Sequence, residues 1–157
     1  MIIHFICRGN VLRSLIAETY LKSLELPNVI VISSGVVTDA NRDSDRPFFE
    51  NTLRLLASHG LKKYIKDNPE QLTQLRIDNN DMVIVMNDRA FSEAKEIVKL
   101  PKTTMVWDIT DIGEGKRTSR IENGREVEEV IYDEITNEID KFVQKYLKKI
   151  RIFSGQH

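Results

Sequence analysis

Cys7 and Arg13 are the first residues of the chain whose types and spacing suggest chemistry. Five residues separate them, and Ser14 follows the arginine directly. A loop of this length can bring a thiol and a guanidinium to opposite sides of one oxyanion. The guanidinium fork matches two oxygens of a phosphate group, and its positive field favours the nucleophilic thiolate form of the cysteine. The Ser14 hydroxyl can donate to the sulfur, so the pattern predicts a cysteine nucleophile beside a bound phosphate.

The segments on either side of this loop predict the elements that must hold it. Residues 2–6 are β-branched and aromatic, which favours a buried strand. A helix is expected from about Arg13, because apolar side chains recur there at helical spacing, at Leu15, Ile16, Tyr20, Leu21 and Leu24. A strand, a tight loop and a helix in this order aim backbone N–H groups at an anion.

Two residues inside the loop are expected to shape its backbone. We expect Gly9 to adopt backbone angles that a Cβ would forbid, and Asn10 is a residue that tolerates the left-handed region. The alternative interpretation is a core cysteine followed by an ordinary first-turn arginine, since free cysteine is among the most buried residue types. The strand predicted before the loop and the helix predicted after it favour the functional interpretation.

Residues 7–14, with the sequence Cys-Arg-Gly-Asn-Val-Leu-Arg-Ser, resemble the signature loop of the low-molecular-weight protein tyrosine phosphatases. The match continues through residues 16–18. Later segments also resemble the family pattern, so the resemblance covers nearly all of the chain: Ser33-Ser34-Gly35, Gln71-Leu72-Thr73, Asp81-Met82-Val83-Ile84-Val85-Met86 and Trp107-Asp108-Ile109-Thr110-Asp111.

This resemblance implies a metal-independent enzyme, without a cofactor, that hydrolyses phosphotyrosine in proteins or small phosphomonoesters through a phosphocysteine. It implies that Cys7 is the nucleophile, Arg13 the phosphate clamp and Asp111 the general acid and base. The residues alone offer both Asp108 and Asp111, and they do not decide between the two. The phosphate-binding residues that the signature implies are Arg8, Gly9, Asn10, Val11, Leu12 and Ser14, and phosphate or sulfate is expected in their loop.

The chain departs from the family pattern mainly around the expected substrate slot. Ile112 replaces a proline, Gly113-Glu114 stands where an aromatic wall is expected, and residues 35–47 lack a tryptophan that family members often carry. Phe48 and Phe49 lie nearby, and we expect both to belong to the core face of a helix. Further departures are Leu15, in place of a proline, and Asn87, in place of an aspartate.

Two branches of the family are distinguished by single residue types. Arsenate reductases of this fold need further cysteines to relay electrons, whereas Cys7 is the only cysteine of this chain. Protein-arginine phosphatases carry threonine where Val11 stands, and a branched apolar residue there goes with tyrosine specificity. The resemblance therefore favours phosphotyrosine as the substrate.

The composition favours one soluble globular domain over residues 1–157. Hydrophobic residues make up 41% of the chain and charged residues 30%, which is enough apolar material for a core. The net charge of −1 predicts no recruitment of nucleic acid or of an anionic membrane. The apolar runs are too short to span a bilayer, and no secretory signal is recognisable. A lone reactive thiol favours a reducing, cytoplasmic location.

The order of the predicted elements indicates a three-layer α/β fold. Strands are expected near residues 2–6, 29–32, 82–86 and 105–107, and helices near 13–24, 48–59, 87–98 and 127–150. Strands that alternate with helices imply right-handed crossovers, and so a four-stranded parallel sheet with helices on both faces. Polar residues 35–47 are expected to form a rim over the site, because the carboxyl ends of parallel strands carry ligand contacts.

Two other classes of function fit parts of the pattern. A phosphocysteine carrier of the sugar-phosphotransferase type also places a cysteine-led anion loop after its first strand, but Arg13 and the downstream acid argue against a carrier. A non-catalytic phosphate-binding or interaction protein would retain the loop without efficient turnover. The altered segment at Asp111-Ile112 keeps this second alternative open.

Overall fold

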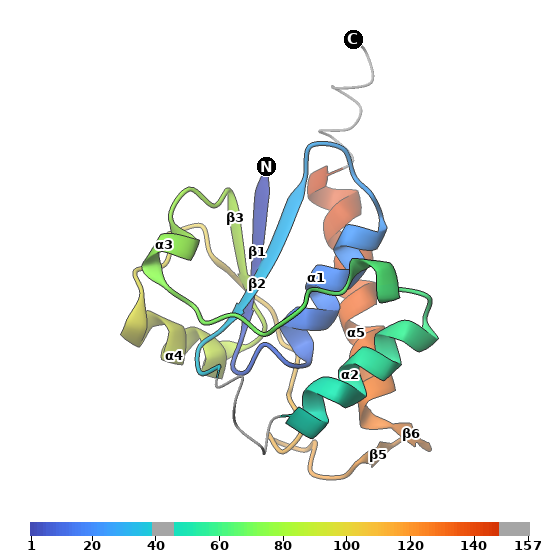
Figure 1. Ribbon diagram of the computed structural model, residues 1–157. Coiled ribbons are helices and arrows are strands. Elements are labelled where there is room, and N and C mark those ends of the chain that lie inside the picture. The colour runs from blue at the N-terminus through green and yellow to red at the C-terminus, as the bar shows by residue number, and fades with distance from the viewer. Residues whose placement is uncertain (39–45, 148–157) are drawn as a thin grey trace.

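A four-stranded parallel sheet forms the centre of the molecule in a computed structural model that describes residues 1–38 and 46–147 (Figure 1). The strand order is β2-β1-β3-β4, so β1 lies inside the sheet between β2 and β3. The bounds are β1 (Ile2–Cys7), β2 (Ile30–Gly35), β3 (Met82–Val85) and β4 (Met105–Val106). The predicted parallel α/β architecture is confirmed.

Helices cover both faces of this sheet (Figure 1). One face carries α1 (Arg13–Ser23) and α5 (Val127–Phe142), with α2 (Arg46–Ser58) packed against both. The other face carries α3 (Gln74–Ile77) and α4 (Asp88–Ile97). None of the helices in these described ranges is long and apolar enough to cross a membrane.

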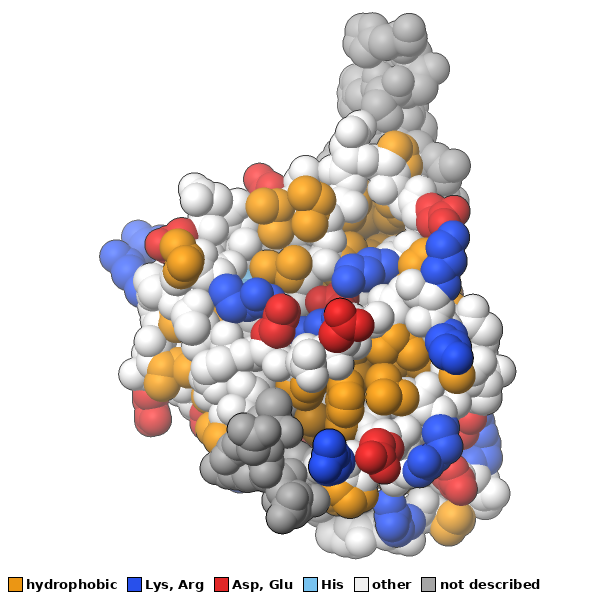
Figure 2. All heavy atoms as spheres, viewed as in Figure 1, with side chains coloured by type: hydrophobic (Ala, Val, Ile, Leu, Met, Phe, Trp, Pro, Cys, Tyr) orange, Lys and Arg blue, Asp and Glu red, His pale blue; other side chains and the backbone are white. Residues whose placement is uncertain are grey.

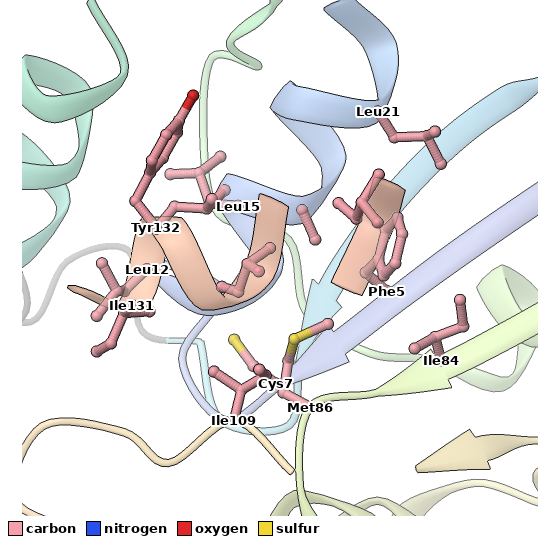
Figure 3. Close-up of a cluster of buried hydrophobic side chains, with 14 of the residues drawn as sticks. Phe5, Cys7, Leu12, Leu15, Leu21, Ile84, Met86, Ile109, Ile131 and Tyr132 are labelled. Carbon is pink, nitrogen blue, oxygen red and sulfur yellow. The ribbon is translucent and has the colours of Figure 1, made fainter. Parts of the chain in front are cut away.

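Strand β1 supplies both hydrophobic cores because successive side chains point to opposite faces of a sheet. Ile3, Phe5 and Cys7 belong to the larger cluster beneath α1 and α5, whereas Ile6 belongs to the cluster beneath α4. Figure 3 shows Cys7 at one end of the larger cluster. Cys7 is therefore the last residue of a strand that is buried from Ile3 onward, which holds its backbone firmly.

Several element boundaries differ from the sequence-based expectations. Helix α2 begins at Arg46 instead of residue 48, and the expected last helix divides into α5 and a wider π-helical segment, η2 (Val143–Leu147). An unexpected hairpin, β5 (Ile121–Glu122) and β6 (Arg125–Glu126), turns through Asn123 and Gly124, both with positive φ. A short helix, η1 (Lys62–Tyr64), interrupts the polar connection before α3. Residues 39–45 of the expected rim and residues 148–150 of the last predicted helix lie outside the described residues.

His4 is a buried polar side chain in the middle of β1, and its ring is fully enclosed. Its Nδ1 lies 2.7 Å from Asn80 Oδ1, which can only accept, so Nδ1 donates there. Its Nε2 lies 2.8 Å from Ser34 Oγ and accepts from that hydroxyl. Burial of the ring lowers the pKa of His4 to about 4, although the hydrogen bond to Asn80 opposes the shift.

This burial predicts a loss of stability on acidification. The pKa of His4 is lower in the folded chain than in the unfolded chain. The contribution of the neutral ring to the free energy of unfolding is therefore complete above about pH 6.5 and is lost as the pH falls towards about 4. Between pH 7.5 and 5.0 we expect His4 to account for a loss of about 2 kcal/mol in the free energy of unfolding. Urea unfolding of wild type and His4→Asn at both pH values measures this loss, which should be smaller in the variant. If the variant loses as much stability as wild type, the titration of His4 is not the cause.

Candidate active site

Residues of the loop between β1 and α1 line a cleft of about 240 Å³. Cys7 ends β1 and is 2% exposed, and Arg13 begins α1 and is 1% exposed. Both side chains line the cleft, as do Arg8, Gly9, Val11 and Leu12 of the intervening loop. The structure therefore brings the predicted thiol and guanidinium to one hollow, at the carboxyl end of the sheet.

The sulfur of Cys7 accepts hydrogen bonds from two groups of the same loop. The backbone N–H of Asn10 lies 3.2 Å from Sγ, and Ser14 Oγ lies 2.9 Å from it. Ser14 Oγ itself accepts from Asn10 Nδ2 at 2.7 Å, so its own proton is free to point at the sulfur. Two donors aimed at one sulfur are placed to stabilise negative charge on it.

Asn10 is the residue that fixes the shape of the loop. Its φ of 56° lies in the left-handed region, as predicted. The buried amide donates to Ser14 and, at 2.8 Å, to Ser33 Oγ of β2, and its Oδ1 accepts from the backbone N–H of Glu70 at 2.9 Å. The side chain thus joins the loop to the next strand and to the segment that precedes α3. Neither Ser33 nor Glu70 was among the predicted site residues, because both contacts depend on the tertiary fold.

Gly35, and not Gly9, is the glycine that the loop requires. The expectation that Gly9 needs unusual backbone angles is wrong: its φ is not positive, and an added Cβ would meet only Val11 at an ordinary 3.5 Å. At Gly35, the last residue of β2, a Cβ would lie 2.8 Å from the carbonyl carbon of Gly9 and 2.9 Å from Arg8 O. The loop passes so close to β2 that a side chain at position 35 cannot be accommodated without movement.

Arg13 is buried, and several acceptors surround its guanidinium. One amino group donates to the backbone oxygen of Ile109 at 2.9 Å, and the other lies 3.3 Å from Asp111 Oδ2 and 3.6 Å from a Glu114 carboxylate oxygen. These partners all come from the segment after β4. Figure 3 shows Ile109 beside Cys7 and Met86, so the same segment also packs against Cys7 from the apolar side.

The structure distinguishes Asp111 from Asp108, the two aspartates between which the sequence alone did not decide. Asp111 lines the cleft, whereas Asp108 is exposed and does not line it. Arg117 anchors the end of this segment: its buried guanidinium donates to Thr110 O at 2.7 Å and pairs with Glu122 and Glu134. The hydrogen bonds to Glu122 and then to Glu134 raise the pKa of Arg117. Asp111 is therefore carried on a firmly attached segment.

Apolar side chains form the walls of the cleft above the loop. Val11, Leu12, Val37, Phe48 and Ile112 all line it. The expectation that Phe48 lies in a helix core is wrong, because its side chain is 42% exposed and faces the cleft; Phe49 does pack against the core. Next to the site, Lys66 and Arg76 both form ion pairs with Glu70. Figure 2 shows basic and acidic side chains intermingled across the middle of the face that it presents.

Comparison with known proteins places these features in context. A family model described as "Low molecular weight phosphotyrosine protein phosphatase" matches residues 2–152. A comparison with curated proteins gave no match. Among solved structures, the YwlE arginine phosphatase from Geobacillus stearothermophilus is 24% identical, with a TM-score of 0.64 and 94% of each chain covered.

Two further solved structures resemble this chain. An arsenate reductase from Archaeoglobus fulgidus DSM 4304 is 22% identical, with a TM-score of 0.65, and the match covers 91% of this chain and 99% of that one. The tyrosine phosphatase Wzb from Escherichia coli K30, in complex with sulphate, is 21% identical, with a TM-score of 0.68 and coverage of 92% and 96%. At these identities the three structures share the fold with this chain.

The close approach at Gly35 predicts that Gly35→Ala will deform the anion loop. We expect phosphate affinity, measured by isothermal titration calorimetry, to fall at least about tenfold, because displaced loop atoms no longer converge on one anion. Gly60→Ala is the matched control: its φ of 77° makes a side chain costly by about 1 kcal/mol, but nothing lies within 4 Å of the added Cβ. Equal phosphate binding by both variants would show that Gly35 has no special role.

Proposed function

The chain belongs to the low molecular weight phosphotyrosine protein phosphatase family, and we propose that it hydrolyses phosphotyrosine through a phosphocysteine formed on Cys7. The observation that carries this proposal is the donor pair, Asn10 N–H and Ser14 O–H, on the sulfur of Cys7, which lines the same cleft as Arg13 and Asp111. Nucleophile, cation and acid thus face one space.

In the first step, the Cys7 thiolate attacks phosphorus. The S–P bond forms while the bond from phosphorus to the tyrosine oxygen breaks, and Asp111 gives its proton to that leaving oxygen. Arg13 and the backbone N–H groups at the start of α1 hold the equatorial phosphate oxygens. The first turn of α1, from Arg13 to Ile16, contains no acidic side chain that would compete with the anion.

In the second step, water attacks the phosphocysteine. Asp111, now a carboxylate, takes a proton from the water while its oxygen bonds to phosphorus and the S–P bond breaks. Inorganic phosphate leaves, and the electron pair returns to the sulfur, where Asn10 N–H and Ser14 O–H stabilise the thiolate. The same two donors therefore assist sulfur as a nucleophile and as a leaving group.

The walls of the cleft support phosphotyrosine as the substrate. An aromatic ring joined to the phosphate would lie between Phe48 and the apolar side chains of Val11 and Ile112. Phe48 supplies, from α2, an aromatic surface that the segment after Asp111 lacks. The single cysteine of the chain offers no second thiol for the electron relay of an arsenate reductase.

The chemical roles can be tested with p-nitrophenyl phosphate in reductant and chelator. We expect wild type to turn over, Cys7→Ser to be inactive, and Asp111→Asn to lose about a hundredfold or more in kcat. Asp108→Asn removes a nearby exposed carboxylate that does not line the cleft, and we expect it to retain wild-type activity.

The same assay separates the competing functions. A folded, reduced wild-type protein that does not turn over but still binds phosphate would indicate a binding protein or a phosphocysteine carrier. Turnover that survives Cys7→Ser, or that falls equally in both aspartate variants, would contradict the assigned roles.

The exposed ring of Phe48 predicts a specific effect on substrate affinity. In Phe48→Ala we expect the KM for a phosphotyrosine peptide to rise about fivefold with little change in kcat, because a ring contact worth about 1 kcal/mol is lost. Leu75→Ala, which removes an 85% exposed side chain on α3, is the control. Unchanged KM in Phe48→Ala, or wild-type preference for a phosphoarginine peptide over the phosphotyrosine peptide, would refute the substrate assignment.

A further inference from the structure

Glu114 is a second carboxylate beside the phosphate clamp. Its Oε1 lies 3.6 Å from the same Arg13 amino group that approaches Asp111, and its side chain is only 15% exposed. In the described part of the chain, Asp111 and Glu114 are the two carboxylates within ion-pair distance of Arg13. Unlike Asp111, Glu114 does not line the cleft, although it approaches the same amino group of Arg13.

The carboxylate of Glu114 is held in place by the beginning of α4. Asn87 Nδ2 donates to Glu114 Oε2 at 3.3 Å, and Arg89 lies 3.9 Å from the same oxygen. Asn87 is itself fixed, because its Oδ1 caps α4 by accepting from Ala90 N–H at 3.0 Å. The backbone of Glu114 also lies in a tight turn, donating to Asp111 O and accepting from Arg117 N–H. Glu114 therefore links Arg13 rigidly to α4.

The two carboxylates cannot both remain ion-paired with Arg13 throughout the proposed reaction. Asp111 must carry a proton when the leaving group departs, and a protonated carboxyl no longer attracts the guanidinium as an anion. Glu114 receives support from an amide donor and a second guanidinium, and nothing in the proposed chemistry protonates it. It is the charged partner that remains on Arg13 during the first step.

We propose that Glu114 is a positioning residue that holds the guanidinium plane of Arg13 while Asp111 acts as an acid. This inference rests on the proposed function. It has two consequences of opposite sign, because the Glu114 charge orders the clamp for the transition state but also repels phosphate and competes with it for Arg13. Removal of the charge should therefore impair turnover and strengthen ground-state binding of the anion.

Glu114→Gln tests both consequences with little change in size. We expect kcat with p-nitrophenyl phosphate to fall about tenfold, because the clamp is less well oriented. We expect the Kd for inorganic phosphate, measured by isothermal titration calorimetry, to fall about threefold, because one competing charge is gone. Glu138→Gln removes the same charge from the exposed side of α5, where Glu138 pairs with Lys141, and should change neither value.

Asn87→Asp separates the positioning effect from the charge effect. Aspartate is as good a helix cap as asparagine, so α4 should remain intact. It cannot donate to Glu114 and instead places a like charge beside it, which displaces the carboxylate from Arg13. We expect kcat to fall as in Glu114→Gln, whereas phosphate binding should weaken about threefold because negative charge has been added.

The outcomes distinguish this inference from the proposed function. Wild type that fails to turn over overturns the proposed function, and the phosphate titrations then decide the role of Glu114: tighter binding by Glu114→Gln supports it, and unchanged binding overturns it. If wild type is active, an unchanged kcat in Glu114→Gln overturns the inference. A loss of kcat together with weaker phosphate binding and a lower melting temperature indicates a merely structural residue, which also overturns it.

Discussion

A guanidinium that is almost completely removed from water must keep partners, and Arg13 imposes this requirement on the whole carboxyl end of the sheet. Its partners are a backbone carbonyl at Ile109 and carboxylates at Asp111 and Glu114, all of them after β4. The start of α1 and the segment after β4 are therefore tied together through one side chain. Because that side chain lines the same cleft as Cys7, the contacts that compensate its burial also bring the Asp111 carboxylate to that cleft.

The loop itself is held from the other side by a series of side-chain hydrogen bonds. Asn10 binds Ser14 within the loop, Ser33 on β2 and the backbone of Glu70, and behind them His4, Ser34 and Arg76 continue the polar contacts into the sheet. The side chains of Asn10, Ser14, Ser33, His4 and Ser34 are buried and hydrogen-bonded to one another or to the backbone, which makes the loop stiff. A stiff anion loop suits phosphoryl transfer, because catalysis there depends mainly on positioning and on electrostatic stabilisation.

Much of the fold and part of the site could be predicted from local sequence, and the remainder depends on contacts between distant segments. The apolar strands, the helix after the loop and the left-handed Asn10 follow from residue types within a few positions of one another. The need for a glycine at position 35 could not be found this way, because it arises from the approach of Gly9 across the sheet. Phe48 was misassigned for a related reason: helical spacing places it on α2, but only the packing of α2 decides that its ring faces the cleft.

The most direct test of the central claim is a search for the phosphocysteine. Wild type and Cys7→Ser would be mixed with a phosphotyrosine peptide, quenched rapidly in acid, and measured by intact-protein and peptide mass spectrometry. We expect one phosphoryl group on wild type, located on Cys7 and lost on continued incubation, and none on Cys7→Ser. Turnover by wild type without any adduct, or an adduct on another residue, would contradict a mechanism built on this sulfur.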